Sequence, residues 1–194
     1  MELRHFTVTM DNGMVIDVAT DDIPIEDYED YLFDCKQDYK QNPCMKTYLR
    51  LLIAESEWDD VNGRTDEAVE RLLQGLDPDN LEALFGNEDD TCPDPSLKII
   101  NAAECLTEFL LKQGKIEEAS EWVEDVYEMS LDRFSGTDQL AYALALRGNC
   151  FQATGKRDAA KVMYEESLNE IDDRISDLTD LRESLRRNLD ELDR

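Results

Sequence analysis

The segment from residue 141 to residue 168 places the strongest constraint on the fold. It holds two amphipathic stretches, 141–153 and 157–168, on either side of Gly155. Apolar residues that recur every three or four positions predict a helix with one buried face in each stretch. Gly155 suits the left-handed conformation that commonly ends a helix. The segment is therefore expected to fold as two antiparallel helices.

Small residues stand where these two helices would cross. Gly148 lies in the first helix and Ala160 in the second, and both allow the backbones to approach closely. The aromatic side chains of Phe151 and Tyr164 would fill the space beside that contact. The pattern therefore specifies how the pair packs as well as where it turns.

Two weaker copies of the same arrangement precede this segment. Their turns are expected at Gly63 and Gly114, so the three turn glycines lie 51 and 41 residues apart along the chain. Residues 86–95, rich in Asp and Pro, are expected to form a loop between the first two copies. The predicted helix pairs are 45–60 with 66–76, 96–113 with 116–132, and 138–154 with 157 onward.

The 141–168 segment resembles the tetratricopeptide repeat, and the resemblance extends more weakly over residues 45–175. Departures from the family pattern are Thr107 in place of a small Gly, Asp59 in an aromatic position, and a spacing longer than the family's about 34 residues. The resemblance implies a mainly α fold, a right-handed stack of about three antiparallel helix hairpins. The matching residues are Leu144, Gly148, Phe151, Gly155, Ala160, Tyr164, Ser167 and Leu168.

The resemblance also implies a concave face, lined by the first helix of each pair, that holds a peptide or a partner helix. Family members that clamp the carboxylate tails of chaperones use lysines in positions that here hold Ile53, Glu104 and Ala145, so that ligand is not expected. The acids predict a basic or amphipathic protein segment instead, although a solvated helix face explains any one of them equally well. The predicted partner-binding residues are Arg50, Ile53, Glu57, Asp60, Asn101, Glu104, Glu108, Lys112, Tyr142, Asn149 and Gln152.

Three flanking segments complete the predicted organisation. Residues 1–20 predict a β-hairpin, because two β-rich runs flank Asn12 and Gly13. Residues 21–44 predict an acidic helix, and residues 176–194 predict a C-terminal helix that caps the stack. The acidic helix is expected to carry an outward acidic ridge of Glu26, Asp27, Glu29 and Asp30.

The apolar pattern of the tail leaves its role open. Spacings of three and four residues favour a helix that covers the last repeat, and a dimer through this helix is the alternative. The pattern continues with a shift of phase after residue 178. The residues concerned are Leu168, Ile171, Ile175 and Leu178, followed by Leu181, Leu185 and Leu192.

The charge of the chain limits its partners. Asp and Glu number 47 against 20 Lys and Arg, which gives a formal net charge of −27. Direct binding to nucleic acid or to an anionic membrane is excluded, because phosphate contacts need clustered cations. A long-range negative field instead attracts basic proteins. The leading hypothesis is an adaptor, chaperone or sequestering inhibitor; an acidic nucleic-acid mimic that blocks a DNA- or RNA-binding protein is the alternative, and salt adaptation is a third.

The sequence offers no catalytic set. His5 is the single histidine, and neither a zinc-ligand spacing nor a glycine-rich phosphate loop is present. We therefore predict no enzyme activity, no metal site and no cofactor. Five cysteines without a C-x-x-C pair, an N-terminus without an apolar signal, and no long apolar run favour a protein of the reducing cytoplasm.

Overall fold

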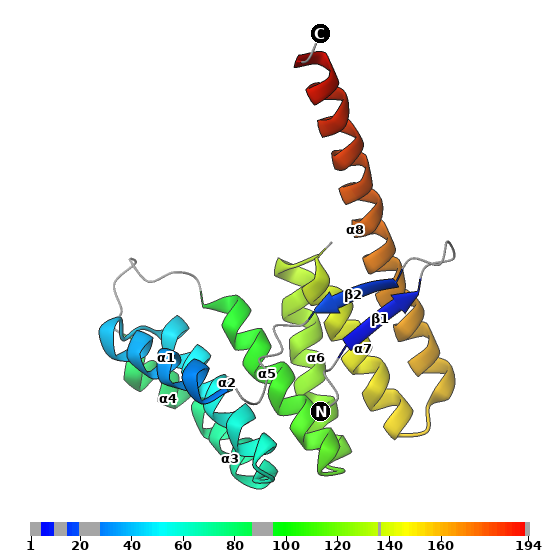
Figure 1. Ribbon diagram of the computed structural model, residues 1–194. Helices are drawn as coiled ribbons and strands as arrows, with labels where there is room; N and C mark the ends of the chain where they lie inside the picture. Colours follow the sequence, from blue (N-terminus) through cyan, green and yellow to red (C-terminus); the bar gives the residue numbers. More distant parts are fainter. Residues whose placement is uncertain (1–4, 10–14, 20–27, 87–94, 136, 193–194) are drawn as a thin grey trace.

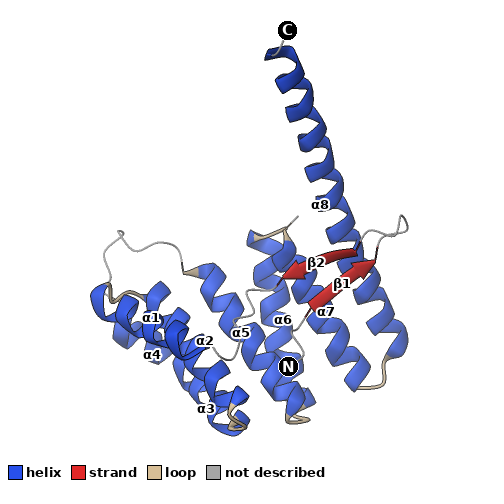
Figure 2. Ribbon diagram, viewed as in Figure 1, coloured by secondary structure: helices blue, strands red, loops and turns tan. Residues whose placement is uncertain are grey.

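The computed structural model is mainly helical (Figures 1 and 2). It describes residues 5–9, 15–19, 28–86, 95–135 and 137–192; for residues 5–9, 15–19, 138 and 176–192 it describes the backbone alone. The helices of this part are α1 (Tyr28–Gln41), α2 (Met45–Val61), α3 (Thr65–Gly75), α4 (Pro78–Phe85), α5 (Ser96–Lys112), α6 (Ile116–Arg133), α7 (Asp138–Ala153) and α8 (Arg157–Leu192).

Six of these helices form three successive pairs. Within each pair, α2 packs on α3, α5 on α6 and α7 on α8. Each pair turns at a glycine with positive φ: 75° at Gly63, 74° at Gly114 and 76° at Gly155. A Cβ atom at these three positions would meet nothing within 4 Å, so it is the backbone conformation that requires glycine there.

The pairs stack in chain order and form two layers. The helices α2, α5 and α7 lie in one layer, since α5 contacts both α2 and α7. The helices α3, α6 and α8 lie in the other, and α3 also contacts α5 while α6 contacts α7. The apolar core runs between the layers, where Leu49, Leu72, Leu106 and Val126 are fully buried and belong to one continuous cluster.

At two other glycines the helices approach so closely that a Cβ atom would fit only if the facing side chain moved. A Cβ atom on Gly148 would lie 2.5 Å from the ring of Tyr164, and one on Gly75 would lie 2.5 Å from the side chain of Leu52. The first contact joins α7 to α8 and the second joins α2 to α3. Side-chain volume on one helix therefore occupies the place of the missing side chain on the other.

The helix α1 packs on the outer side of α2 through a second, smaller apolar cluster. Leu32 and Cys35 of α1 meet Ala54 of α2 there, with Tyr31 and Trp58 beside them. An ion pair between Lys36 and Glu55, at 3.4 Å, spans the same junction.

The structure differs from the predicted organisation in two places. The helix α4 lies between the predicted helix 66–76 and the predicted loop 86–95, where no helix was expected: the Asp77 side chain accepts a hydrogen bond from the backbone N–H of Asn80 at 2.9 Å, and Pro78 occupies the first turn. The boundary expected at 175/176 does not coincide with a helix end, because α8 continues to Leu192.

The N-terminal residues form two paired strands. The strand β1 (His5–Thr9) runs antiparallel to β2 (Val15–Ala19), with His5 opposite Ala19. The turn expected at residues 12–13 lies outside the described residues, so the hairpin stays a prediction. Within the described part of the chain, no helix combines the length and the apolar composition needed to cross a membrane.

Candidate functional site

The layer of α2, α5 and α7 brings together six of the residues predicted to bind a partner. Spacings of three or four residues place each set on one side of its helix. Contacts between the helices then join the sets across two junctions, α2–α5 and α5–α7. We call this surface the first-helix face and define it as Glu57, Asp60, Glu104, Glu108, Lys112 and Tyr142.

At the α2–α5 junction, two carboxylates of α2 meet α5. The Sγ atom of Cys105 lies 3.8 Å from Glu57, and the Tyr28 hydroxyl of α1 donates to the other oxygen of Glu57. Asp60 accepts from the Lys112 ammonium at 2.5 Å and from the hydroxyl of Thr65 at 2.8 Å. The Lys112 ammonium therefore pairs with Asp60, whereas Glu57 accepts from the Tyr28 hydroxyl.

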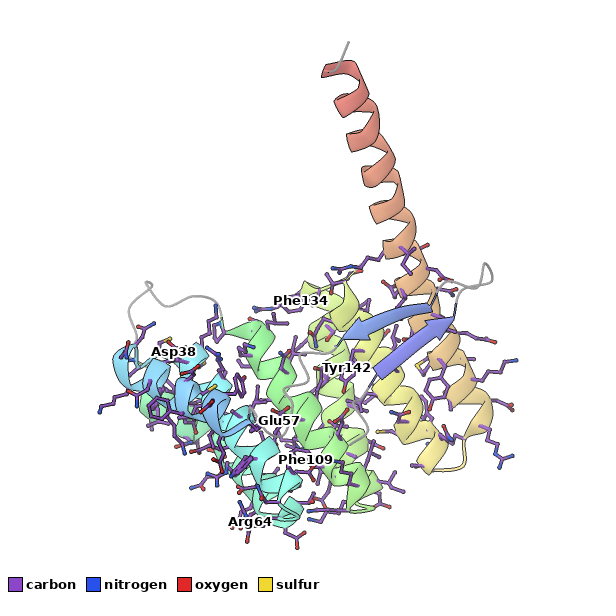
Figure 3. The ribbon with its side chains drawn as sticks, in the orientation of Figure 1. Asp38, Glu57, Arg64, Phe109, Phe134 and Tyr142 are labelled. Atoms are coloured by element: carbon purple, nitrogen blue, oxygen red, sulfur yellow. The ribbon has the colours of Figure 1, made fainter. Side chains whose placement is uncertain are left out.

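At the α5–α7 junction, two carboxylates of α5 receive neutral donors. The side-chain amide of Gln139 donates to Glu104 at 2.5 Å, and the Tyr142 hydroxyl donates to Glu108. Figure 3 labels Glu57 at the first junction and Tyr142 at the second. In the part of the chain with described side chains, no ion pair to Glu104 is formed.

Burial changes the acidity of Glu104. The residue is 7% exposed, and this removal from water raises the pKa of its carboxyl to about 8. The hydrogen bond from Gln139 acts in the opposite direction, while the negative charge of Glu108 raises the pKa further. Glu104 is therefore largely protonated at neutral pH.

The two tyrosines of these junctions remain hydrogen-bond donors. Burial, and then the adjacent charge of Glu57, raises the pKa of Tyr28. Burial and the adjacent charge of Glu108 raise the pKa of Tyr142 in the same way. Both hydroxyls therefore keep their protons at any physiological pH and satisfy only one acceptor each.

The first-helix face has more acidic than basic side chains. Its four acids, of which Glu104 is largely protonated at neutral pH, contrast with one cationic side chain, Lys112. On the same side of α5, three residues before Glu104, the Oδ1 atom of Asn101 is buried without a hydrogen-bond partner. Added cations or hydrogen-bond donors would therefore be stabilised at this face.

Other predicted partner-binding residues are engaged elsewhere. Arg50 turns toward α1, where it pairs with Asp38 at 3.1 Å and lies over the ring of Tyr31 at 5.5 Å. Ile53 packs against the main core. Asn149 and Gln152 are exposed, and the amide oxygen of each lies 2.8 Å from the Tyr164 hydroxyl of α8, which can donate to one of them at a time.

Half of the predicted acidic ridge can be placed. Glu29 and Asp30 are exposed in the first turn of α1, while Glu26 and Asp27 lie outside the described residues. Carboxylates in the first turn of a helix are favourable in themselves, because they face the positive end of its dipole. The two placed acids therefore need no partner to explain them.

Sequence reasoning did not find three contributors to the junctions: Gln139, Cys105 and Tyr28. Gln139 stands one turn before Tyr142, so the periodicity of α7 was the available signal. Tyr28 lies on the apolar face of α1, and this position predicts that the side chain is buried but does not predict its hydrogen bond to Glu57. The pairing depends on how α1 and α2 are rotated, which local spacing does not encode.

In the described part of the chain, no group of three His, Cys, Asp or Glu side chains is placed to hold a metal ion. Cys35 and Cys150, which lie in that part, are free thiols. No model of a known protein family matches the chain, and no curated protein matches its sequence. Function must therefore be inferred from the first-helix face itself.

Proposed function

We propose that this chain is a non-enzymatic protein-binding module, a right-handed tetratricopeptide-like stack of about three helix pairs. Successive pairing of the helices, the three positive-φ glycine turns and the contact of Gly148 with Tyr164 support the likeness. As an adaptor, chaperone or sequestering inhibitor, the module holds a basic or amphipathic segment of a partner protein. No reaction step is assigned to any residue.

The observation that carries the proposal is the surplus of carboxylates on the first-helix face. Among the described side chains, no cation pairs with the buried Glu104, which accepts from the amide of Gln139, and Glu108 accepts from the Tyr142 hydroxyl. An arginine or lysine of a partner would supply the missing charge, and charge-assisted hydrogen bonds are about twice as strong as neutral ones. The net charge of −27 would speed the encounter with a basic partner.

A binding experiment at pH 9 tests this proposal with two variants that are charge-matched there, because Glu104, with a pKa of about 8, is ionised at that pH. The probe is a fluorescent helical peptide with arginines on one side and leucines on the other. The double variant Glu104→Gln and Glu108→Gln removes two acids from the face, and we expect its affinity to fall at least about tenfold. The control Glu29→Gln and Asp30→Asn removes two exposed acids of α1 and should change affinity less than about twofold. Equal losses would show that only the overall field matters.

Binding should also depend on pH in a defined direction. A cation beside Glu104 favours the ionised carboxyl, whose pKa is about 8 in the free protein. Peptide affinity should therefore rise between pH 6.5 and 9 in the native chain and stay level in the Glu104→Gln variant. The nucleic-acid mimic makes a different prediction: duplex DNA should then compete with this protein for a shared basic target.

A further inference from the structure

The helix α8 extends well beyond the helix on which it packs. It has 36 residues, whereas α7 has 16. The Ser167 hydroxyl donates to the backbone carbonyl of Ala141 at 2.7 Å, so the first turn of α7 lies beside residue 167. Residues 172–192 therefore continue past the start of α7 for about 30 Å, and Figure 1 shows this part projecting from the helix pairs.

The projecting helix carries one continuous heptad pattern. Counting Arg182 as a core position removes the shift of phase that the leucines alone suggest. Seven of the eight core positions are then apolar, at alternating intervals of three and four residues. The positions are Leu168, Ile175, Arg182 and Leu189 at a, and Ile171, Leu178, Leu185 and Leu192 at d.

An apolar stripe on a projecting helix favours a partner, since most of the stability of helices in proteins comes from packing an apolar side. At the start of the stripe, where side chains are described, Leu168 is 48% exposed although it follows the buried Ser167. Heptads with isoleucine and leucine at a and d are typical of helices that pair with each other.

We propose that α8 pairs antiparallel with α8 of a second copy of this chain. A parallel pair would place Arg182 against the partner's Arg182 in one core layer, where two like charges repel. In an antiparallel pair centred near residue 180, Arg182 instead lies opposite the partner's Leu178. The same register sets Ile175 opposite the partner's Leu185.

Charge complementarity fixes the same orientation independently. The flanking e positions of the antiparallel register place Asp172 near the partner's Arg186, and two-fold symmetry repeats this pair at the other end. In a parallel pair, Asp172 would face the partner's Ser167, and Arg186 would face the partner's Leu181. Opposite charges therefore meet only in the antiparallel arrangement. The dimer would hold its two helix stacks at opposite ends.

The test is sedimentation of the full-length chain at physiological salt over a wide concentration range. We expect a reversible dimer, and we expect Leu185→Asp to abolish it while circular dichroism and melting of the helix stack stay unchanged. A chain that is monomeric at every concentration would overturn the proposal. So would a dimer that Leu185→Asp leaves intact.

Charge exchange tests the orientation. Asp172→Arg alone, or Arg186→Asp alone, should raise the dimer dissociation constant about tenfold, because each creates two repulsive pairs. The double variant restores opposite charges and should return within about threefold of the native value. A double variant no tighter than the two singles, or singles without effect, would exclude the antiparallel register.

Discussion

Two junctions in this molecule bury a carboxylate to nearly the same extent, yet they leave it in opposite states. Asp59, at the α2–α3 junction, is 6% exposed and accepts from Arg64 at 2.5 Å and from Arg71 at 2.8 Å. Glu104, at the α5–α7 junction, is 7% exposed and accepts from the neutral amide of Gln139. The two side chains are thus equally buried, but Asp59 is bonded to two arginines and Glu104 to a neutral amide.

The pKa values follow from that difference. Burial opposes ionisation of Asp59, but the hydrogen bonds and charges of Arg64 and Arg71 outweigh it and hold its pKa below the ordinary value. For Glu104 burial prevails, and the pKa rises to about 8. The α2–α3 junction is thus complete within the chain, whereas the α5–α7 junction keeps an acid that an external cation could ionise.

The largest expected effect is on the stability of the Glu104→Gln variant at high pH. The folded pKa of Glu104 lies above the unfolded one, so its protonated form favours folding and the native chain loses stability as pH rises from about 4.5 to 8. Above pH 8 the variant should be more stable than the native chain by about 2–4 kcal/mol, and near pH 4.5 the two should coincide. Denaturant unfolding at several pH values measures the difference. A constant difference across this range would contradict the raised pKa.

The next effect, opposite in sign, is expected for Asp59→Asn. Removing the carboxylate leaves two guanidinium groups without their shared acceptor, which we expect to cost about 1–3 kcal/mol, since Arg64 and Arg71 are partly exposed and screened. The contribution of Asp59 is present above its unfolded pKa and is lost as pH falls through its lower folded pKa. Native chain and variant should therefore differ at pH 7 and converge in strong acid.

A matched substitution separates burial from ion pairing in that experiment. Glu67 also pairs with Arg64, at 3.0 Å, but its side chain is 59% exposed. Glu67→Gln should cost less than about 0.5 kcal/mol, as exposed ion pairs usually do. A loss as large as that of Asp59→Asn would show that the arginine, and not the buried carboxylate, determines the stability of the junction.

Features that depend on residues close together in the chain could be predicted from the sequence. Mainly helical structure follows from the three-and-four periodicity, and the positive φ at Gly155 is the conformation that a turn glycine predicts. The close contact at Gly148 follows from a small residue placed opposite an aromatic one. The helix α4 was missed because an Asp-Pro step both interrupts one helix and begins another, and residue type alone does not separate the two.

Features that depend on how each helix is rotated about its axis could not be predicted from the sequence. Spacing places Glu104, Glu108 and Lys112 on one side of α5, and the structure does join them to α2 and α7. The spacing, however, does not predict that Arg50 turns to α1 or that Asn149 bonds to α8, as the structure shows. Those choices depend on the angle at which whole helices pack, which residues far apart in the chain decide together.

A small expected change in a single pKa tests whether the two acids of α5 act as one site. The charge of Glu108 contributes to the raised pKa of Glu104, after burial. Glu108→Gln keeps an acceptor for Tyr142 but removes that charge, so the pKa of Glu104 should fall by less than about one unit, a change of roughly 1 kcal/mol. Carbon NMR titration of labelled glutamate side chains measures the shift directly. If the pKa of Glu104 does not move, the two carboxyls titrate independently, and a partner cation would have to engage them separately. A measurable fall means that one cation, placed between them, gains from both.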